Sequence, residues 1–277
     1  MEKEQRKIFQ QEQLNILEEI HALCTKHKLT YYIICGTALG AVRHGGFIPW
    51  DPDIDIAMPR DDYDRFVNHV WQQMDTKYRC VSYNDYKNYV SPHAIVYLKN
   101  SKLTKHKPDY FREELRPVGI YLDVMPLDVA PMNVADQERQ AKAIARIKSF
   151  RKIKLYSLGQ SKGYKKKIVR FLLRIITSPV TMRYFNQKLE KEITRYRNDK
   201  TSTLWCSMTS HYSYKKQCMP IAMYGKPTLI KFEGIEVYGP EKMSDYLTKI
   251  YGDYMKVPPL SERIKSENHF DAVEVWL

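Results

Sequence analysis

The stretch that decides the fold is residues 31–58, YYIICGTALGAVRHGGFIPWDPDIDIAM. Its aromatic and β-branched start predicts a short buried strand over residues 31–35, which stops at Gly36. A short helix is predicted over residues 37–44, because Thr37 can cap its first turn and a glycine pair follows it. A loop then leads to a second strand at DIDI. The segment therefore reads as strand, turn, helix, loop and strand.

Two carboxylates at the end of this stretch are spaced to act together. Asp53 and Asp55 are two residues apart in a predicted strand, so both side chains project to one face. Neighbouring carboxylates repel by about 1 kcal/mol in water at about 4 Å, and by several times more in a cleft. A hard divalent cation, Mg²⁺ or Mn²⁺, relieves that repulsion. The pattern favours a metal site, and acids in a solvated turn are the alternative.

A third acid lies on a separate predicted strand. Residues 119–125 read GIYLDVM between Pro117 and Pro126, and they carry Asp123. Three carboxylates from neighbouring strands can hold the metal ions of a phosphoryl-transfer site. Asp123 could also take the proton of an attacking hydroxyl. The simpler alternative is that Asp123 caps the end of a strand.

Residues between the first predicted strand and the Asp53–Asp55 strand are suited to bind phosphate. The backbone N–H groups of Gly36 and Thr37, with the threonine hydroxyl, offer a phosphate seat at a helix start. Arg43 presents a fixed fork of donors for phosphate oxygens, and His44 either binds phosphate or bonds to the backbone.

Two motifs in this chain resemble one protein family. GTALGAVRHGGFIPWDPDIDI, residues 36–56, is similar to the signature of LicD-type phosphotransferases, relatives of fukutin and fukutin-related protein in the nucleotidyltransferase-fold superfamily. YLTKIYGDYMKVPP, residues 246–259, resembles the closing motif of the same family and contains Tyr251 and Lys256. The chain departs from the first motif at Pro52, where the family usually carries Asp. Pro52 leaves the two metal-type positions intact.

The resemblance implies a fold, a reaction and a set of site residues. The fold would be α+β, a nucleotidyltransferase-like mixed β-sheet core flanked by helices, with a basic helical insertion. The reaction would pass phosphocholine, or a related phospho-alcohol, from a CDP-linked donor to a sugar hydroxyl of a cell-surface glycan or teichoic acid precursor, releasing CMP. Mg²⁺ or Mn²⁺ would be held by three catalytic acids, Asp53, Asp55 and Asp123. The expected substrate-binding residues are Gly36, Thr37, Arg43, His44, Trp50, Tyr251 and Lys256.

The chain divides by composition into three parts. Residues 1–134 are expected to form the catalytic core, 135–200 a basic helical insertion, and 201–277 the part that completes the active-site domain. In the insertion, IVRFLLRII follows the run Lys165, Lys166 and Lys167. That pattern is typical of a helix lying on an anionic membrane surface. A helix packed on the domain with a solvated basic face is the equal alternative.

Composition limits the cellular setting and the partners. The 277 residues carry a formal charge of +13, which favours an anionic partner such as a lipid-linked glycan acceptor or an anionic membrane. Five scattered cysteines without a C-x-x-C pair argue against disulfides and structural zinc, and indicate a reducing cytoplasm. The charged N-terminus and the lack of a long apolar run predict no secretory signal and no membrane-spanning helix. We therefore expect a cytoplasmic protein, peripheral at the inner face of the cell membrane.

Two other functions are compatible with the same sequence observations. A true nucleotidyltransferase would need the same acids but would release pyrophosphate. A non-catalytic scaffold at the membrane surface would not need them at all. Nucleic acid is not an expected partner, because the basic residues stand beside apolar ones and form no RNA-reading module that we recognise.

Overall fold

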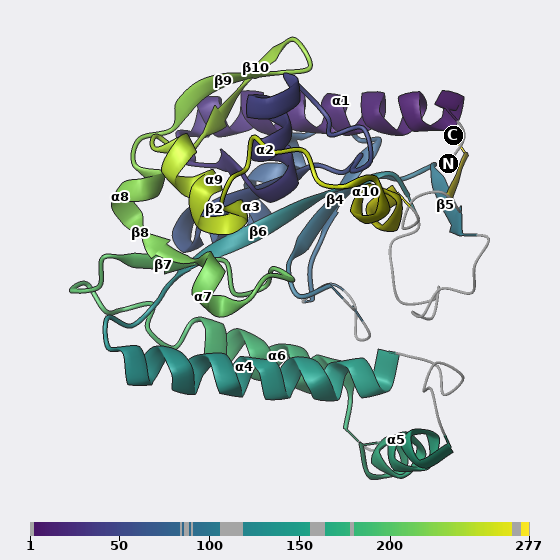
Figure 1. Ribbon diagram of the computed structural model, residues 1–277, viewed down its shortest axis with the longest axis vertical. Helices are drawn as coiled ribbons and strands as arrows, with labels where there is room; N and C mark the ends of the chain where they lie inside the picture. Colours follow the sequence, from purple (N-terminus) through teal and green to yellow (C-terminus); the bar gives the residue numbers. More distant parts are fainter. Residues whose placement is uncertain are drawn as a thin grey trace.

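The protein is described here by a computed structural model covering residues 3–83, 85, 89, 91–105, 119–155, 164–177, 180–267 and 273–276. Its centre is a mixed sheet with helices on both sides (Figure 1). Five strands follow the spatial order β1 (Tyr32–Ile33), β2 (Asp55–Pro59), β6 (Tyr121–Val129), β4 (Ala94–Leu98) and β3 (Tyr78–Val81). This arrangement confirms the predicted α+β class.

One strand pair in the sheet is parallel and places the acids. β2 and β6 run parallel, with Asp55 opposite Asp123, whereas the other pairs of the sheet are antiparallel. The far end of β6 pairs with β7 (Leu204–Cys206), which pairs with β8 (Cys218–Pro220). Two smaller sheets are separate from this one: the hairpin of β9 (Thr228–Phe232) and β10 (Ile235–Gly239), and the pair β5 (Lys102–Lys105) with β11 (Val273–Trp276).

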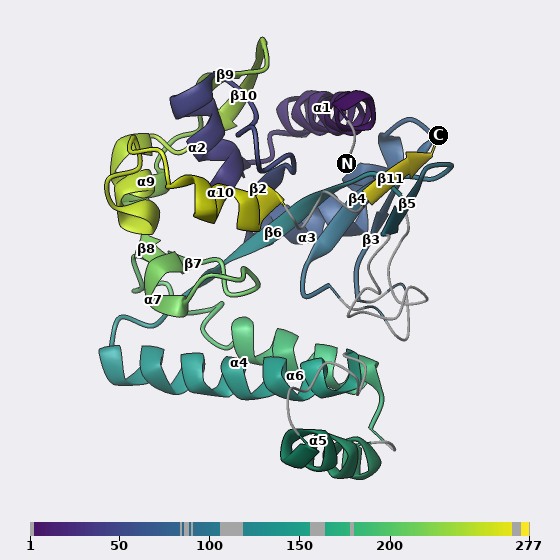
Figure 2. The same cartoon turned by 45° about the vertical axis from the view of Figure 1, so that its right-hand side comes forward.

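The helices cover the sheet in two groups (Figures 1 and 2). The first group surrounds the acidic strands: α1 (Lys3–His27), α2 (Cys35–His44), α3 (Arg60–Asn68), the 3₁₀ helix η1 (Val70–Gln73), α8 (Ile221–Tyr224), α9 (Met243–Tyr251) and α10 (Leu260–Glu267). The second group lies beyond the end of β6: α4 (Val134–Leu155), α5 (Tyr164–Thr177) and α6 (Met182–Ile193). The short α7 (Tyr214–Gln217) lies between the two groups.

The core explains why these residues form these elements. In β2, Ile56, Ala57 and Met58 are fully buried, and α1 buries the apolar face formed by Ile16, Leu17 and Ile20. The stretch FEGIEV, residues 232–237, predicts a hairpin around Glu233-Gly234, and the structure confirms it: both residues have positive φ, 50° and 86°, as a two-residue turn between strands requires. A helix is likewise predicted from about Glu241 to Tyr251, and α9 is present there and ends at Gly252, where φ is 73°.

Some predicted boundaries were wrong. The first strand is shorter than expected, and α2 begins at Cys35 rather than Thr37. The strand bearing Asp123 does not stop before Pro126 but continues to Val129. Proline is tolerated there because β4 pairs only as far as Val124 and β7 pairs from Asp128 onward, so Pro126 lies in the gap between them. The division into three parts at residues 134 and 200 stays a prediction.

The sequence also predicts that Asp61 or Asp62 caps the helix after β2, and the structure differs. No side chain caps α3, whose first turn contains Asp61 and Asp62. Asp62 instead accepts a hydrogen bond from the Thr30 backbone N–H at 3.0 Å. Asp61 pairs with Arg197 at 2.5 Å. Both carboxylates therefore bind distant parts of the chain, and tertiary contacts replace the local cap.

A buried ion-pair network joins the core to α6. The guanidinium of Arg60 donates to both carboxylate oxygens of Asp128, at 2.6 and 2.8 Å, and to Glu190 at 2.9 Å. Arg60 and Asp128 are almost completely buried, 5% and 1% exposed. Burial raises the pKa of Asp128 even though Arg60 opposes that shift. The network therefore ties α3, β6 and α6 together at the base of the helical group.

Candidate active site

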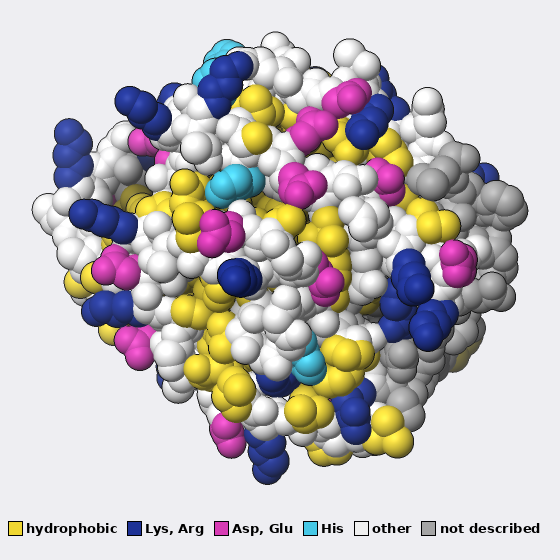
Figure 3. Space-filling view, turned by 90° about the horizontal axis from the view of Figure 1, so that it is seen from above, with side chains coloured by type: hydrophobic (Ala, Val, Ile, Leu, Met, Phe, Trp, Pro, Cys, Tyr) yellow, Lys and Arg dark blue, Asp and Glu magenta, His cyan; other side chains and the backbone are white. Residues whose placement is uncertain are grey.

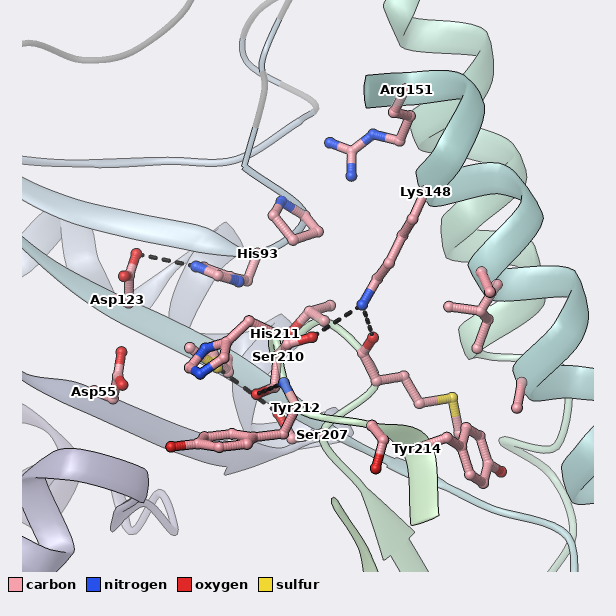
Figure 4. Close-up of a pocket in the computed structure, with 18 of the residues that line it drawn as sticks. Asp55, His93, Asp123, Lys148, Arg151, Ser207, Ser210, His211, Tyr212 and Tyr214 are labelled. Carbon is pink, nitrogen blue, oxygen red and sulfur yellow. Dashed lines mark hydrogen bonds and ion pairs between the residues drawn. The ribbon is translucent and has the colours of Figure 1, made fainter. Parts of the chain in front are cut away.

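The three predicted acids line one pocket. Asp55 is the first residue of β2, Asp53 lies two residues before it, and Asp123 comes from β6. The parallel register sets Asp55 directly beside Asp123, because both strands are hydrogen-bonded neighbours in the sheet. The pocket has a volume of about 520 Å³ (Figure 4). Asp53, Asp55 and Asp123 are only half-buried, so their carboxylates can meet a ligand in this pocket.

The charges of these acids are unfavourable in the absence of a cation. Burial first, and then the negative charges of neighbouring acids, raise the pKa of Asp53 well above its usual range. Those neighbours are Asp51, Asp55 and Asp123. The pKa of Asp55 is raised for the same reasons, with Asp123 the strongest charge acting on it. The site therefore favours protons or cations.

Asp51 is an acid beside this site that the prediction from Asp53 and Asp55 did not include. It carries on the two-residue spacing of Asp53 and Asp55, which is the signal that could have found it. Its carboxylate lies against Gly36, where an added Cβ would stand only 2.6 Å from Oδ2. Gly36 therefore makes room for an acidic side chain at the start of α2.

The turn before α2 holds the acidic strand in place. Thr37 is buried, and its hydroxyl accepts a hydrogen bond from the Asp55 backbone N–H at 2.8 Å. Cys35 adopts a positive φ of 50°, and its N–H donates to the Tyr246 hydroxyl at 3.0 Å. Non-glycine residues in this conformation are strained and occur mostly where surrounding contacts fix them. Tyr246 belongs to the closing motif, so that motif supports the start of α2.

His93 is a second residue that the sequence reading missed. It lies just before β4, and its Nε2 is 3.0 Å from the Asp123 carboxylate, to which it can donate (Figure 4). Its other ring nitrogen, Nδ1, is buried and has no hydrogen-bond partner among the residues that the structure describes. The histidine therefore holds the Asp123 carboxylate in position, and its Nδ1 could form a further hydrogen bond.

The opposite side of the pocket comes from α4 and from the loop at residues 207–213. Lys148 and Arg151 contribute from α4, and His211 and Tyr212 from the loop (Figure 4). The His211 and Tyr212 rings lie 4.1 Å apart, and burial lowers the pKa of His211. The pocket is thus acidic on the sheet side and basic or aromatic on the other.

Four of the predicted substrate-binding residues form a separate cluster, which is not part of the lining of this pocket. The Arg43 guanidinium donates to His44 Nε2 at 3.0 Å and to the carbonyl oxygen of Lys256 at 3.5 Å. It also lies 5.7 Å from the Trp50 ring, whose other cationic neighbour is Arg263 at 5.3 Å. Burial, and then Arg43, lower the pKa of His44. Trp50 therefore has cations of this chain against its ring.

Tyr251 connects this region to the pocket. Its hydroxyl lies 3.0 Å from that of Tyr212, and the two rings meet edge to face at 5.9 Å. Tyr212 lines the pocket, so Tyr251 supports a pocket wall from behind. The substrate-binding role expected for these residues stays a prediction.

The donor set suits a hard divalent cation. Carboxylate oxygens are the ligands that Mg²⁺ and Mn²⁺ prefer. Among the described residues, no three His, Cys, Asp or Glu side chains form a ready metal cage. Mg²⁺ usually takes one or two carboxylates and completes its shell with water and substrate phosphates. Asp53 and Asp55 meet that requirement, and burial first, then the repulsion between neighbouring acids, raises the pKa of both carboxyl groups.

Comparison with known proteins agrees with this geometry. Residues 28–117 match the family described as LicD/FKTN/FKRP, nucleotidyltransferase domain. The chain is 29% identical over 252 residues to the lipopolysaccharide cholinephosphotransferase LicD of Haemophilus influenzae, covering 89% of each chain. An uncharacterized protein of Rickettsia typhi is 41% identical over 64 residues, 23% of this chain and 21% of the relative.

Proposed function

We propose that this protein is a phosphotransferase of the LicD type, which transfers phosphocholine, or a related phospho-alcohol, from a CDP-linked donor to a sugar hydroxyl of a cell-surface glycan or teichoic acid precursor. The observation that carries the proposal is the meeting of Asp53, Asp55 and Asp123 in one pocket. The similarity to a lipopolysaccharide cholinephosphotransferase over most of both chains supports the kind of group transferred.

In the proposed reaction, the acceptor hydroxyl oxygen bonds to the phosphorus that carries the alcohol. The bond from that phosphorus to the oxygen it shares with CMP breaks, and CMP leaves with the electron pair. Asp123 receives the hydroxyl proton, and His93 holds its carboxylate in position. Asp53 and Asp55 would hold Mg²⁺ or Mn²⁺, which when bound would neutralise charge on the diphosphate. The pocket positions donor and acceptor together.

Product analysis tests this function directly. The purified chain is incubated with Mg²⁺ and CDP-choline, CDP-ethanolamine, CDP-glycerol or CDP-ribitol, with and without a glycan acceptor. We expect CMP to appear with one donor and to increase with the acceptor. Pyrophosphate release from a nucleoside triphosphate would identify a nucleotidyltransferase instead. If neither CMP nor pyrophosphate is released under any condition, the result would favour a non-catalytic scaffold.

We also propose that α5 rests on an anionic membrane surface, where a lipid-linked acceptor would be presented. In both ribbon views α5 lies apart from the sheet, beyond α4 (Figures 1 and 2). One side of the helix exposes Ile168, Phe171, Leu172 and Ile175, each 40–55% exposed. Its sequence also carries five Lys and Arg residues. On the face over α1 and the β9–β10 hairpin, by contrast, acidic and basic side chains are interspersed (Figure 3).

The described residues contain no helix long and apolar enough to cross a membrane. Replacing Phe171, Leu172 and Ile175 together with Ser is expected to weaken binding to anionic vesicles at least about tenfold, because apolar area no longer enters the interface. Co-sedimentation with phosphatidylglycerol vesicles measures this. Leu229→Ser, at an equally exposed position on β9, is the matched control. Equal sedimentation of the triple variant and the wild type would contradict the proposal.

A further inference from the structure

The basic wall of the pocket contains a lysine held in an unusual way. Lys148 Nζ donates to the carbonyl oxygens of Met208 and Ser210, at 2.7 and 3.0 Å. An ammonium group has three donors, so one N–H remains after these two bonds. Figure 4 shows the side chain reaching from α4 into the pocket, toward the side that carries His93. The remaining donor is available to a ligand there.

Within the part of the chain that the structure describes, no acid balances the charge of Lys148. Among the described residues, no carboxylate lies within ion-pair distance of Lys148 Nζ, and its hydrogen-bond acceptors are the two carbonyls. Burial lowers its pKa to about 8, and the charges of Arg151 and Lys152 act in the same direction. Buried charges in proteins are normally paired. The arrangement therefore lacks an anion.

Arg151 lies beside it on the same face of α4. The two residues are three positions apart, so their side chains emerge from adjacent turns of the helix. Arg151 is only 4% exposed and lines the same pocket. Burial lowers its pKa as well. A guanidinium and an ammonium placed together form a common binding site for phosphate oxygens.

We infer that Lys148 and Arg151 form an anion subsite for a phosphate group of the donor, facing the acidic wall across the pocket. The acids Asp53 and Asp55 and their cation would meet one side of the diphosphate, and α4 would meet the other. This assignment rests on the proposed function, because it takes the donor to be a diphosphate. It gives the helical insertion a direct role in substrate binding.

A purely structural role for Lys148 is the competing explanation. Its two hydrogen bonds hold the 207–213 loop against α4, so its loss could disturb the pocket without any contact to substrate. The test must therefore separate the positive charge from the attachment of the loop. Lys148→Arg keeps the charge, Lys148→Gln removes it, and Arg151→Gln removes the neighbouring charge.

Calorimetric titration of the full chain with pyrophosphate at fixed Mg²⁺ is the experiment. We expect Lys148→Gln and Arg151→Gln each to weaken binding by about 10- to 100-fold, as for loss of a charged hydrogen bond. Lys148→Arg should stay within about threefold of the wild type. Lys142→Gln, at an exposed position on the same helix, is the control and should bind normally. Thermal unfolding of each variant checks that the fold is intact.

The pH dependence of pyrophosphate affinity is a measurement that a purely structural role of Lys148 would not change. Between pH 7 and 9, Lys148 loses its proton, so wild-type affinity should fall about tenfold relative to Lys148→Arg. Pyrophosphate itself also changes protonation over this range, but this affects both proteins equally and cancels in the ratio of the wild-type affinity to the Lys148→Arg affinity. Other groups near Lys148 are Arg151 and Lys152 on α4, Cys206 on β7 and His211 in the loop; the acids and His93 lie across the pocket.

Two results would overturn the subsite. One is unchanged pyrophosphate affinity in Lys148→Gln and Arg151→Gln. The other is weaker binding in Lys148→Gln alone, with no difference in pH dependence between the wild type and Lys148→Arg. Failure of the proposed reaction would look different: the charge-dependent pyrophosphate binding would remain, but no CDP-alcohol would release CMP.

Discussion

Replacing Asp53 with Asn is expected to reduce CMP release by at least about 10²- to 10³-fold, because charge stabilisation at the diphosphate depends on this carboxylate. The substitution keeps the size of the side chain and removes one negative charge. Steady-state rates with the active CDP-alcohol and Mg²⁺ measure the effect. Glu138→Gln is the matched control, since it makes the same chemical change at an exposed position on α4.

The same substitution is expected to stabilise the protein when divalent cations are absent. The pKa of Asp53 is raised in the folded state, so in the window between its unfolded and folded pKa values the unfolded chain binds fewer protons. Wild-type stability therefore falls as the pH rises from about 4 through that window. The amide side chain in the variant does not ionise, so the variant escapes this loss. Chemical denaturation at several pH values, with EDTA, measures the difference.

Added Mg²⁺ should reverse the order of stability. A cation bound to the folded state alone stabilises it by mass action. The wild type should therefore gain melting temperature with increasing Mg²⁺, and Asp53→Asn should gain much less. Equal turnover in the variant and the wild type, or an equal Mg²⁺ response, would remove the basis for the catalytic role of Asp53.

Replacing Arg60 with Leu is expected to lower the free energy of unfolding by about 3–5 kcal/mol, because it leaves a buried carboxylate without its partner. Asp128 is 1% exposed and receives two hydrogen bonds from Arg60. Urea denaturation followed by circular dichroism measures the change. Arg139→Leu, which breaks an exposed pair with Asp136 on α4, should cost less than about 1 kcal/mol.

The effect of Arg60→Leu should depend on pH. The pKa of Asp128 is already raised by burial, and removal of Arg60 takes away the charge that opposes this shift. At low pH Asp128 is protonated and neutral, so removal of Arg60 costs little stability. The destabilisation should therefore grow as the pH rises. The double variant Arg60→Leu/Asp128→Leu should recover much of the stability, because no charge is then left unpaired. A pH-independent loss with no recovery would indicate a packing defect instead.

The sequence predicted those parts of the site whose geometry is local. The alternation of Asp53, Ile54, Asp55 and Ile56 follows from the two-residue period of a strand, and the structure buries the isoleucines and leaves the acids at the pocket. The hairpin turn at residues 233–234 was equally readable, because its backbone conformation is set by the residues within the turn.

Parts that depend on distant partners were not readable in the same way. Thr37 was expected to receive phosphate, a role that stays a prediction, and the structure adds that its hydroxyl accepts from the Asp55 backbone, 18 residues away. Arg43 and Trp50 were expected at the substrate, which also stays a prediction, and the sequence did not indicate that they contact each other. Polar and aromatic side chains can satisfy their interactions with many partners, so residue type alone does not choose between substrate and protein.

By itself, the sequence determined the acidic strand and the turn before α2, since short-range periodicity and turn chemistry decide them, while the α+β class was implied by the resemblance to the LicD family. Only the tertiary structure brought Asp123 beside Asp55, His93 onto Asp123, and Lys148 and Arg151 across from the acids. These spatial arrangements depend on strand order and on how α4 packs against the 207–213 loop. No local pattern encodes them, because the residues involved are separated by tens of positions in the chain.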